Sequence, residues 1–280
     1  MAIAEFKEAV ILLIRIPALW IPGVIGGFLA ATLFVIYNFS GAFYAGRLLI
    51  LSGLVLLLFT TGMLATIKKN EGNIRTLLEG GSRYYFRVLL PQLIIIFTVI
   101  LIVTFVMITL SFISASSDVS SITALTLGFL IPLIVLTIFY DTAAIFEDRK
   151  VFDSIRRSVQ LVMTHLREVI TFLFVCAVIS IGIIFSLMIV WEAFLYDKLE
   201  PITRYNETQL QTFSPDQLIT IIGPGGMWIT VIILFIGFFL LIPLLFSYKA
   251  CVFRKLTRET VIIQQETNGE YDSKGRWYKY

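Results

Sequence analysis

The sequence predicts an all-α integral membrane protein with six transmembrane helices. Of its 280 residues, 58% are hydrophobic and 15% are charged, whereas soluble proteins carry about 25% charged residues. The mean hydropathy is +0.90. The apolar residues gather into runs long enough to cross about 30 Å of hydrocarbon, which takes about 20 helical residues. Composition and clustering together place the chain among multi-pass membrane proteins.

Six apolar runs reach that length. In chain order, the predicted spans are 16–37, 48–67, 88–113, 122–146, 169–196 and 228–248. The first is not expected to be a cleavable signal peptide, because Glu5, Glu8 and Arg15 precede its core and no small-residue cleavage site follows it.

Amphipathic segments precede the first, third and fifth spans, at 4–15, 72–87 and 151–168. In the last of them, Val151, Ile155 and Val159 share one helical face, which predicts a helix lying along the inner membrane surface. The chain then consists of three repeats of a surface helix plus a transmembrane hairpin. The predicted units are 4–71, 72–150 and 151–255 within a membrane domain 1–255, and a cytoplasmic polar tail follows at 256–280.

Basic residues predict the orientation of the spans. The N-terminus, the second and fourth connections and the C-terminal region hold 19 of the 22 lysines and arginines, and the opposite side holds Arg47, Lys198 and Arg204. Cytoplasmic loops carry such an excess. We therefore predict a plasma-membrane protein with both termini cytoplasmic. Topology accounts for the net charge of +3, and no nucleic-acid partner is expected.

Two N-x-[ST] sequons, at Asn38 and Asn206, fall in predicted outer loops, where a glycosylation machinery has access. Chance occurrence is the alternative explanation for both sequons.

Small residues and prolines mark candidate packing positions within the spans. Gly23, Gly27 and Ala31 follow small-xxx-small spacing, which permits close contact between helices. Packing within the chain is preferred and homodimerisation is the alternative. Pro132 and Pro243 are predicted to kink their helices. Kinks that serve packing are preferred over broken helices that line a transport site.

Asp141, in "FYDTAAIFEDRK", lies within the last turns of an apolar span. A lone carboxylate at that depth costs about 2.5 to 3.5 kcal/mol and needs a partner, a cavity or the headgroups. The stretches "GFLIPLIVLTIFYDTAAIF" and "GFFLLIPLLFSYKACVF" match with a short gap, which places Asp141 and Lys249 at equivalent positions. We predict an intramembrane ion pair between them. A pair with Arg156, solvation at the inner interface and a proton or ion site are the alternatives.

The stretch from that span into the following surface helix, "FYDTAAIFEDRKVFDSIRRSVQLVMTHLREVI", carries a family resemblance. It resembles the prokaryotic polytopic membrane proteins grouped with the membrane domain of glycerophosphoryl diester phosphodiesterases, whose archaeal relatives are families of unknown function. The matching residues are Ala143, Ala144, Asp148, Ser154, Ser158 and Leu161. The phosphodiesterase activity of that family belongs to a soluble domain with His and Glu clusters, which this sequence does not contain. The resemblance thus implies a membrane body with no assigned activity.

The residues needed for catalysis are scarce. The chain has one histidine, His165, and its two cysteines have no zinc spacing. We therefore expect no enzyme activity, cofactor or metal. The preferred function is a non-enzymatic integral membrane protein that organises the membrane or a membrane complex. Its expected partners are membrane lipids. The expected assemblies are a homo-oligomer or a membrane complex of which this chain is a subunit. The alternative is a small transporter or channel with a polar path that includes Asp141.

Overall fold

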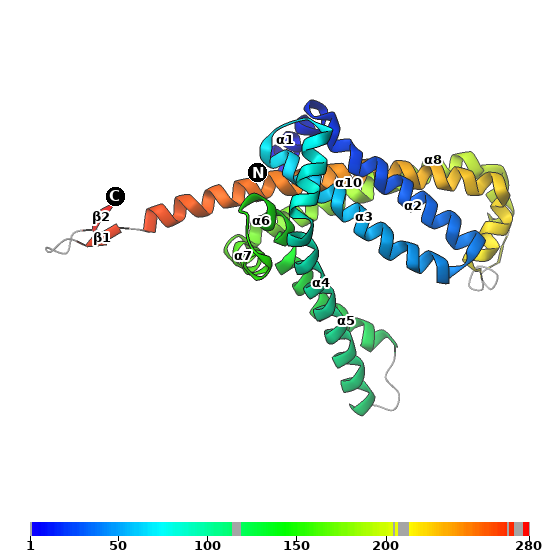
Figure 1. The fold of residues 1–280 in the computed structure, drawn as a ribbon. Coiled ribbons are helices and arrows are strands. Elements are labelled where there is room, and N and C mark those ends of the chain that lie inside the picture. Colours follow the sequence, from blue (N-terminus) through cyan, green and yellow to red (C-terminus); the bar gives the residue numbers. More distant parts are fainter. Residues whose placement is uncertain are drawn as a thin grey trace.

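The computed structural model describes residues 2–113, 119–203, 205–206, 213–267, 269–271 and 277–279. This part of the chain is almost entirely helical (Figure 1). The helices are α1 (Ala2–Arg15), η1 (Pro17–Trp20), α2 (Ile21–Ser40), α3 (Ala42–Lys69), α4 (Ile74–Ile113), α5 (Val119–Thr137), α6 (Tyr140–Phe146), α7 (Val151–Thr164), α8 (Leu166–Thr203) and α10 (Pro215–Thr267). Strands β1 (Gly269–Tyr271) and β2 (Trp277–Lys279) pair antiparallel, with Gly269 opposite Lys279.

Six helical segments are long and apolar enough to cross a membrane. They are Pro17–Ser40, Ala42–Lys69, Ile74–Thr109, Thr123–Phe146, Leu166–Ile202 and Gln217–Glu259. Each predicted span overlaps one of them. The six-span, all-α fold class is therefore confirmed, apart from the two three-residue strands near the C-terminus.

The helices form two arms that diverge from one common end (Figure 1). The larger arm is a bundle in which α2, α3, α8 and α10 lie side by side. The smaller arm consists of α5 and the C-terminal half of α4. It leaves the bundle at an angle. The short helices α1, α6 and α7 gather where the arms meet.

The buried core also lies near this common end. Leu19, Met63 and Ile145 belong to one cluster of buried side chains, and Phe139 and Tyr248 belong to a second. Large apolar side chains along the arms are exposed instead, including Phe97, Phe105 and Phe185. Such a surface suits lipid tails, which are as apolar as these side chains. The common end is thus the firmly packed part of the molecule.

Two of the three predicted surface helices are present as separate helices, and their place along the membrane surface remains a prediction. α1 and α7 are separate helices, but the predicted surface helix at 72–87 is wrong, because α4 continues without interruption from Ile74 to Ile113. Glycines explain why this half of α4 stays against α3. A Cβ on Gly62 would lie 2.2 Å from the carbonyl oxygen of Leu77, and one on Gly81 would lie 2.6 Å from that of Leu58. The threefold repeat remains a prediction.

The two predicted proline kinks are not helix breaks. α5 continues through Pro132 and α10 continues through Pro243. The non-helical residue inside α10 is Gly223, with φ 62° and ψ −174°. Nine residues before Gly223, the Ser214 N–H donates to the Gln217 side chain at 2.9 Å, and the Gln217 N–H donates to the Ser214 hydroxyl at 3.3 Å. This capping box starts the helix.

The predicted tail at 256–280 begins inside a helix. α10 continues to Thr267, and the β1–β2 hairpin follows it. The predicted boundary at residue 255 therefore falls within one long helix.

Candidate functional site

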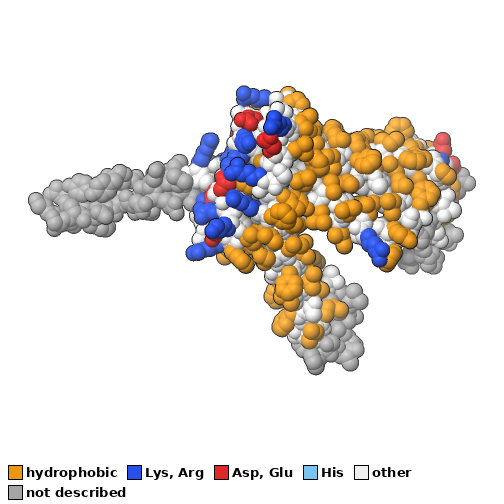
Figure 2. Space-filling model, viewed as in Figure 1, with side chains coloured by type: hydrophobic (Ala, Val, Ile, Leu, Met, Phe, Trp, Pro, Cys, Tyr) orange, Lys and Arg blue, Asp and Glu red, His pale blue; other side chains and the backbone are white. Residues whose placement is uncertain are grey.

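Charged side chains concentrate where the two arms meet (Figure 2). We call this region the basic end. It consists of α1, the last turn of α3, the first turns of α4, residues 147–168 and residues 254–258 of α10. In the same view, hydrophobic side chains cover most of the two arms, and a few charged side chains lie toward the far end of the larger arm. The polar chemistry of the described chain is therefore concentrated at one end.

Asp141 and Lys249 meet just inside the basic end. The Nζ atom of Lys249 lies 2.7 Å from each carboxylate oxygen of Asp141. The Asp141 side chain is 8% exposed and the Lys249 side chain is 15% exposed. Asp141 Oδ1 also accepts the Thr142 N–H at 2.7 Å. The pair joins α6 to α10, so the structure compensates the intramembrane charge of Asp141 within the protein, while Arg156 lies exposed on α7.

A break in the fourth span places Asp141 in the first turn of a helix. α5 ends at Thr137 and α6 begins at Tyr140. Ser158 of α7 supplies the hydrogen bonds at this break: its hydroxyl donates to the Leu136 carbonyl at 2.8 Å and accepts the Phe139 N–H at 3.0 Å. Broken membrane helices need such substitutes for their lost backbone bonds. Hydropathy does not reveal the break, because the apolar run is continuous across it.

The buried face of α7 is also different from the apolar stripe in its sequence. Ser154, Ser158 and Leu161 are buried, whereas Val151, Ile155 and Val159 are only partly covered. The small serines let α7 approach the break in the fourth span. α7 therefore packs through its serine face and leaves its valine and isoleucine stripe at the edge of the contact.

A cavity of about 250 Å³ with a largely apolar wall lies beside Asp141, between α3, α4, α6 and α10. Thr60, Thr61 and Gln92 contribute to its lining. The Thr61 hydroxyl and Gln92 Oε1 are buried without a hydrogen-bond partner among the described residues. A polar ligand or water has access to Asp141 through this cavity.

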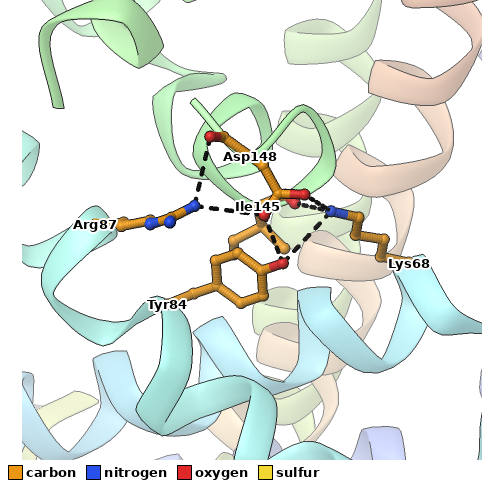
Figure 3. Close-up of polar contacts among 5 residues, drawn as sticks. All are labelled: Lys68, Tyr84, Arg87, Ile145 and Asp148. Carbon is orange, nitrogen blue, oxygen red and sulfur yellow. Dashed lines mark hydrogen bonds and ion pairs between the residues drawn. The ribbon is translucent and has the colours of Figure 1, made fainter. Parts of the chain in front are cut away.

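Asp148 forms the centre of a second polar cluster (Figure 3). Its carboxylate accepts Lys68 Nζ at 2.6 Å and the Tyr84 hydroxyl at 2.7 Å. Arg87 lies 3.4 Å from both its carboxylate and its carbonyl oxygen. Lys68 also donates to the Ile145 carbonyl at 2.7 Å. The hydrogen bond from Lys68, and then that from Tyr84, lowers the pKa of Asp148 below its ordinary value.

The local backbone explains how one aspartate reaches three partners. Asp148 has a φ of 53°, in the left-handed region that Asp tolerates better than most residues. Its neighbour Glu147 accepts Arg157 and Arg149, each at 3.0 Å. The turn after α6 is thereby tied to α3, α4 and α7. This network holds the bases of both arms together.

A cavity at the basic end has a volume of about 620 Å³. It lies between α1, the end of α3, the end of α6 and the inner part of α10, and three arginines line it: Arg15, Arg254 and Arg258. A neighbouring cavity of about 380 Å³ contains the Glu5–Lys255 ion pair, whose atoms are 2.7 Å apart. Both cavities have mixed polar and apolar walls.

No group of three His, Cys, Asp or Glu side chains is placed to hold a metal ion within the described ranges. Cys176 and Cys251 are free thiols. The acids at the basic end instead form the ion pairs and hydrogen bonds given above. The basic side chains at this end that form no ion pair in the described part of the chain can bind negatively charged groups.

The remaining predicted residues lie away from the basic end. Gly23 and Gly27 pack α2 onto α10: added Cβ atoms would lie 2.4 Å from the Phe239 carbonyl oxygen and 2.6 Å from that of Phe235. Ala31, on the same face, is 8% exposed. These residues therefore form an intramolecular contact. Homodimerisation through this face is excluded while the contact is made.

Both sequons lie at the end of the larger arm opposite the basic end. Asn38 is in the last turns of α2, where its amide donates to the Phe34 carbonyl at 2.7 Å. Asn206 is exposed after α8. Use of either position for glycosylation remains a prediction.

Comparisons of the chain with protein-family models, with curated proteins and with solved structures find no match. The resemblance to the membrane domain of glycerophosphoryl diester phosphodiesterases therefore rests on the sequence motif alone. Two of the motif residues have clear structural contacts here, since Asp148 ties the arms together and Ser158 bridges the helix break.

Proposed function

We propose that this protein is a non-enzymatic integral membrane protein that organises the membrane by gathering anionic lipids at its basic end. The observation that carries this proposal is the concentration of Lys and Arg at the point from which both apolar arms leave (Figure 2). With that end facing the cytoplasm, as the charge distribution predicts, the cations meet the anionic leaflet of the plasma membrane. Both termini are then cytoplasmic.

Exposed cations support the proposal. Arg15, Lys150, Arg156 and Arg258 are exposed at the basic end, and no ion pair engages them among the described residues. A basic residue near an anionic membrane surface contributes about 1 kcal/mol to the attraction. The amphipathic helices α1 and α7 lie at the same end and bring their basic residues to the headgroup level. Several such residues together attract a cluster of anionic lipids.

The alternative function, a small transporter or channel, rests on Asp141 and the cavity beside it. A transport path would have to join that cavity to both ends of the molecule. The cavities at the basic end, at Asp141 and at Asn38 share no lining residue, and Lys249 already neutralises Asp141. These observations favour the organising function.

Reconstitution of the full chain into vesicles tests the proposal. The vesicles contain phosphatidylcholine and a minor fraction of phosphatidylserine, part of which carries a self-quenching fluorophore. We expect the protein to quench the labelled phosphatidylserine at low salt and to lose this effect in 1 M salt, where the Debye length falls to about 3 Å. A labelled phosphatidylcholine is the control. Equal quenching of labelled phosphatidylserine and labelled phosphatidylcholine by the protein would contradict the proposal.

The same vesicles test the alternative. A pH-dependent ion flux that the protein induces, and that Asp141→Asn abolishes without lowering thermal stability, would establish the transporter function in place of the organising one.

A further inference from the structure

We infer that the 620 Å³ cavity at the basic end binds one phosphate-bearing anionic headgroup, with Arg15 and Arg258 as its principal ligands. This inference deepens the proposed function and rests on it, because it names the site and the chemical class that the gathered lipids share. The volume is large enough for a phosphate group together with the glycerol part of a lipid.

The cavity has an excess of positive charge. Arg15, Arg254 and Arg258 face two acids, Glu8 and Glu147. Arg157, which does not line the cavity, and Arg149 already pair with Glu147, at 3.0 Å each. Glu8 is therefore the one uncompensated acid among these lining residues, against three arginines. An anion entering the cavity gains a net attraction.

The arginines suit a phosphate in geometry as well as in charge. A planar guanidinium presents paired N–H donors that match two phosphate oxygens. Arg15 and Arg258 are exposed and have no ion pair or hydrogen bond among the described residues, so both have donors to spare. Arg254 is fixed in place, since it donates to the Ile67 carbonyl and lies 5.3 Å from the ring centre of Phe146. It contributes charge rather than direct contact.

A neutral donor completes the polar part of the site. The Thr257 hydroxyl is buried and has no hydrogen-bond partner among the described residues. It belongs to the cavity lining, between the two neighbours Arg254 and Arg258 on α10. A buried hydroxyl without a partner is destabilising by about 1 to 3 kcal/mol, and a bound phosphate oxygen would accept its hydrogen bond.

Apolar side chains distinguish a lipid from free phosphate. Ile11, Leu12 and Phe253 also line the cavity, and Ile11 is exposed beside it. The α1 helix carries Ile11 and Arg15 one turn apart, so a headgroup bound to Arg15 has an apolar surface for the carbons that follow it. Inorganic phosphate would leave this surface unused.

The neighbouring 380 Å³ cavity differs from the 620 Å³ cavity in its charge balance, which is why we assign the anion to the larger one. It is lined by two bases, Arg167 and Lys255, and two acids, Glu5 and Glu168. Lys255 and Glu5 form an ion pair at 2.7 Å. Since that cavity has no excess of positive charge, it offers an anion no comparable attraction.

Equilibrium binding to the full chain in a non-ionic detergent tests the inference. The probes are dihexanoyl phosphatidate, dihexanoyl phosphatidylcholine and inorganic phosphate, and native mass spectrometry counts the bound molecules. We expect one phosphatidate to bind. Arg15→Gln and Arg258→Gln should each lower its affinity about tenfold, as expected for the loss of one charge-assisted contact. Glu8→Gln should raise the affinity about twofold to threefold, since it removes the opposing charge.

Arg156→Gln is the matched control, because Arg156 is an exposed arginine of α7 outside the cavity. It should leave the affinity unchanged within about twofold. Equal binding by this control and by the Arg15→Gln and Arg258→Gln variants would overturn the site. All substituted side chains are exposed, so folding is preserved, and Glu8→Gln tests the site in the opposite direction.

The remaining outcomes separate the sources of the phosphate and the two proposals. Displacement of phosphatidate by equimolar inorganic phosphate would support the site and assign its ligand to solution; resistance to millimolar phosphate would support a lipid. If Arg15→Gln and Arg258→Gln leave phosphatidate binding unchanged, the site is wrong. Lipid clustering by the protein would then leave the proposed function standing without this site. Phosphatidate binding without clustering would leave the site standing and remove the proposed function.

Discussion

Two aspartates seven residues apart both pair with a lysine but differ in their exposure to solvent. Asp141 is almost fully covered and depends on one cation, Lys249. Asp148 is 49% exposed and is held by donors from two helices. A buried charge that loses its only partner is strongly destabilising, whereas water replaces much of a lost surface contact. The two residues should therefore respond differently to substitution and to pH.

Asp141→Asn and Lys249→Gln should each lower the thermal stability of the protein in detergent. Breaking a fully buried pair costs about 3 to 5 kcal/mol, and the effect here should lie toward the lower value because 15% of the Lys249 side chain is exposed. The double variant should recover part of the loss, since no unpaired charge remains. Thermal unfolding of the four proteins measures this coupling. Simple addition of the two single losses would show that the pair makes no net contribution.

Asp148 gives stability a dependence on acid. Its pKa is lowered in the folded protein, mainly by the hydrogen bond from Lys68, so folding favours the charged form. The resulting stabilisation is fully present above the ordinary pKa of 3.8 and is lost as the pH falls through the lower, folded value. We expect Asp148→Asn to lower stability at pH 7 and to flatten the stability profile below about pH 4. Parallel profiles of wild type and variant in that range would contradict this assignment.

The sequence allowed the Asp141 partner to be predicted but not the partners of Asp148. Asp141 and Lys249 occupy equivalent places in two similar stretches, which was enough to suggest a pair. Lys68 and Tyr84 are 80 and 64 residues from Asp148 in sequence. No spacing rule connects such distant charges. Their meeting depends on how α3 and α4 pack, which a single sequence does not reveal.

At the scale of helices, small residues decide which pairs pack closely. Pro243 has no N–H, so the Phe239 carbonyl four residues earlier has no helical partner. Gly23 brings the backbone of α2 against that carbonyl and the proline ring. Gly62 and Gly81 make the same kind of approach between α3 and α4. Hydrophobic burial cannot drive such contacts in lipid, so close packing of this kind is their main source of stability.

Gly23→Ala should lower the thermal stability in detergent by about 1 to 3 kcal/mol, the usual effect of overpacking. The added Cβ would lie 2.4 Å from a backbone oxygen, which cannot move without shifting α10. Gly46→Ala is the matched control, because Gly46 is an exposed helical glycine with no atom within 4 Å of an added Cβ. It should be neutral or stabilise by up to about 1 kcal/mol. Equal melting temperatures for the two variants would remove Gly23 from the packing argument.

Hydropathy predicted the existence of all six spans but not their interruptions. The break at 138–139 lies inside an uninterrupted apolar run, and Ser158, from another helix, satisfies the backbone there. The opposite error occurred at 72–87, where mixed charge suggested a separate surface helix and α4 instead continues. In both cases, contacts with another helix outweigh the local pattern.

For the whole molecule, the distribution of charge and apolar surface defines a direction. Both arms leave one charged end, and their exposed side chains are largely apolar (Figure 2). The packed core and the polar networks also lie at that end. The two arms together contain three helical hairpins, α2–α3 and α8–α10 in the larger arm and α4–α5 in the smaller, and these resemble hairpins inserted from one side of a bilayer and anchored by a common base. The distribution of basic residues in the sequence predicts that this base faces the cytoplasm.

Cysteine labelling of intact cells tests this orientation. Asn206→Cys places a thiol in an exposed position beyond α8, at the end opposite the basic end, and Thr267→Cys places one at the last residue of α10. We expect a membrane-impermeant maleimide to modify position 206 in intact cells, and position 267 only after permeabilisation, because the excess of Lys and Arg predicts a cytoplasmic basic end. The unsubstituted chain, with Cys176 and Cys251 inside its spans, is the control for background labelling. Modification of position 267 without permeabilisation would reverse the topology and place the proposed lipid site on the outer leaflet.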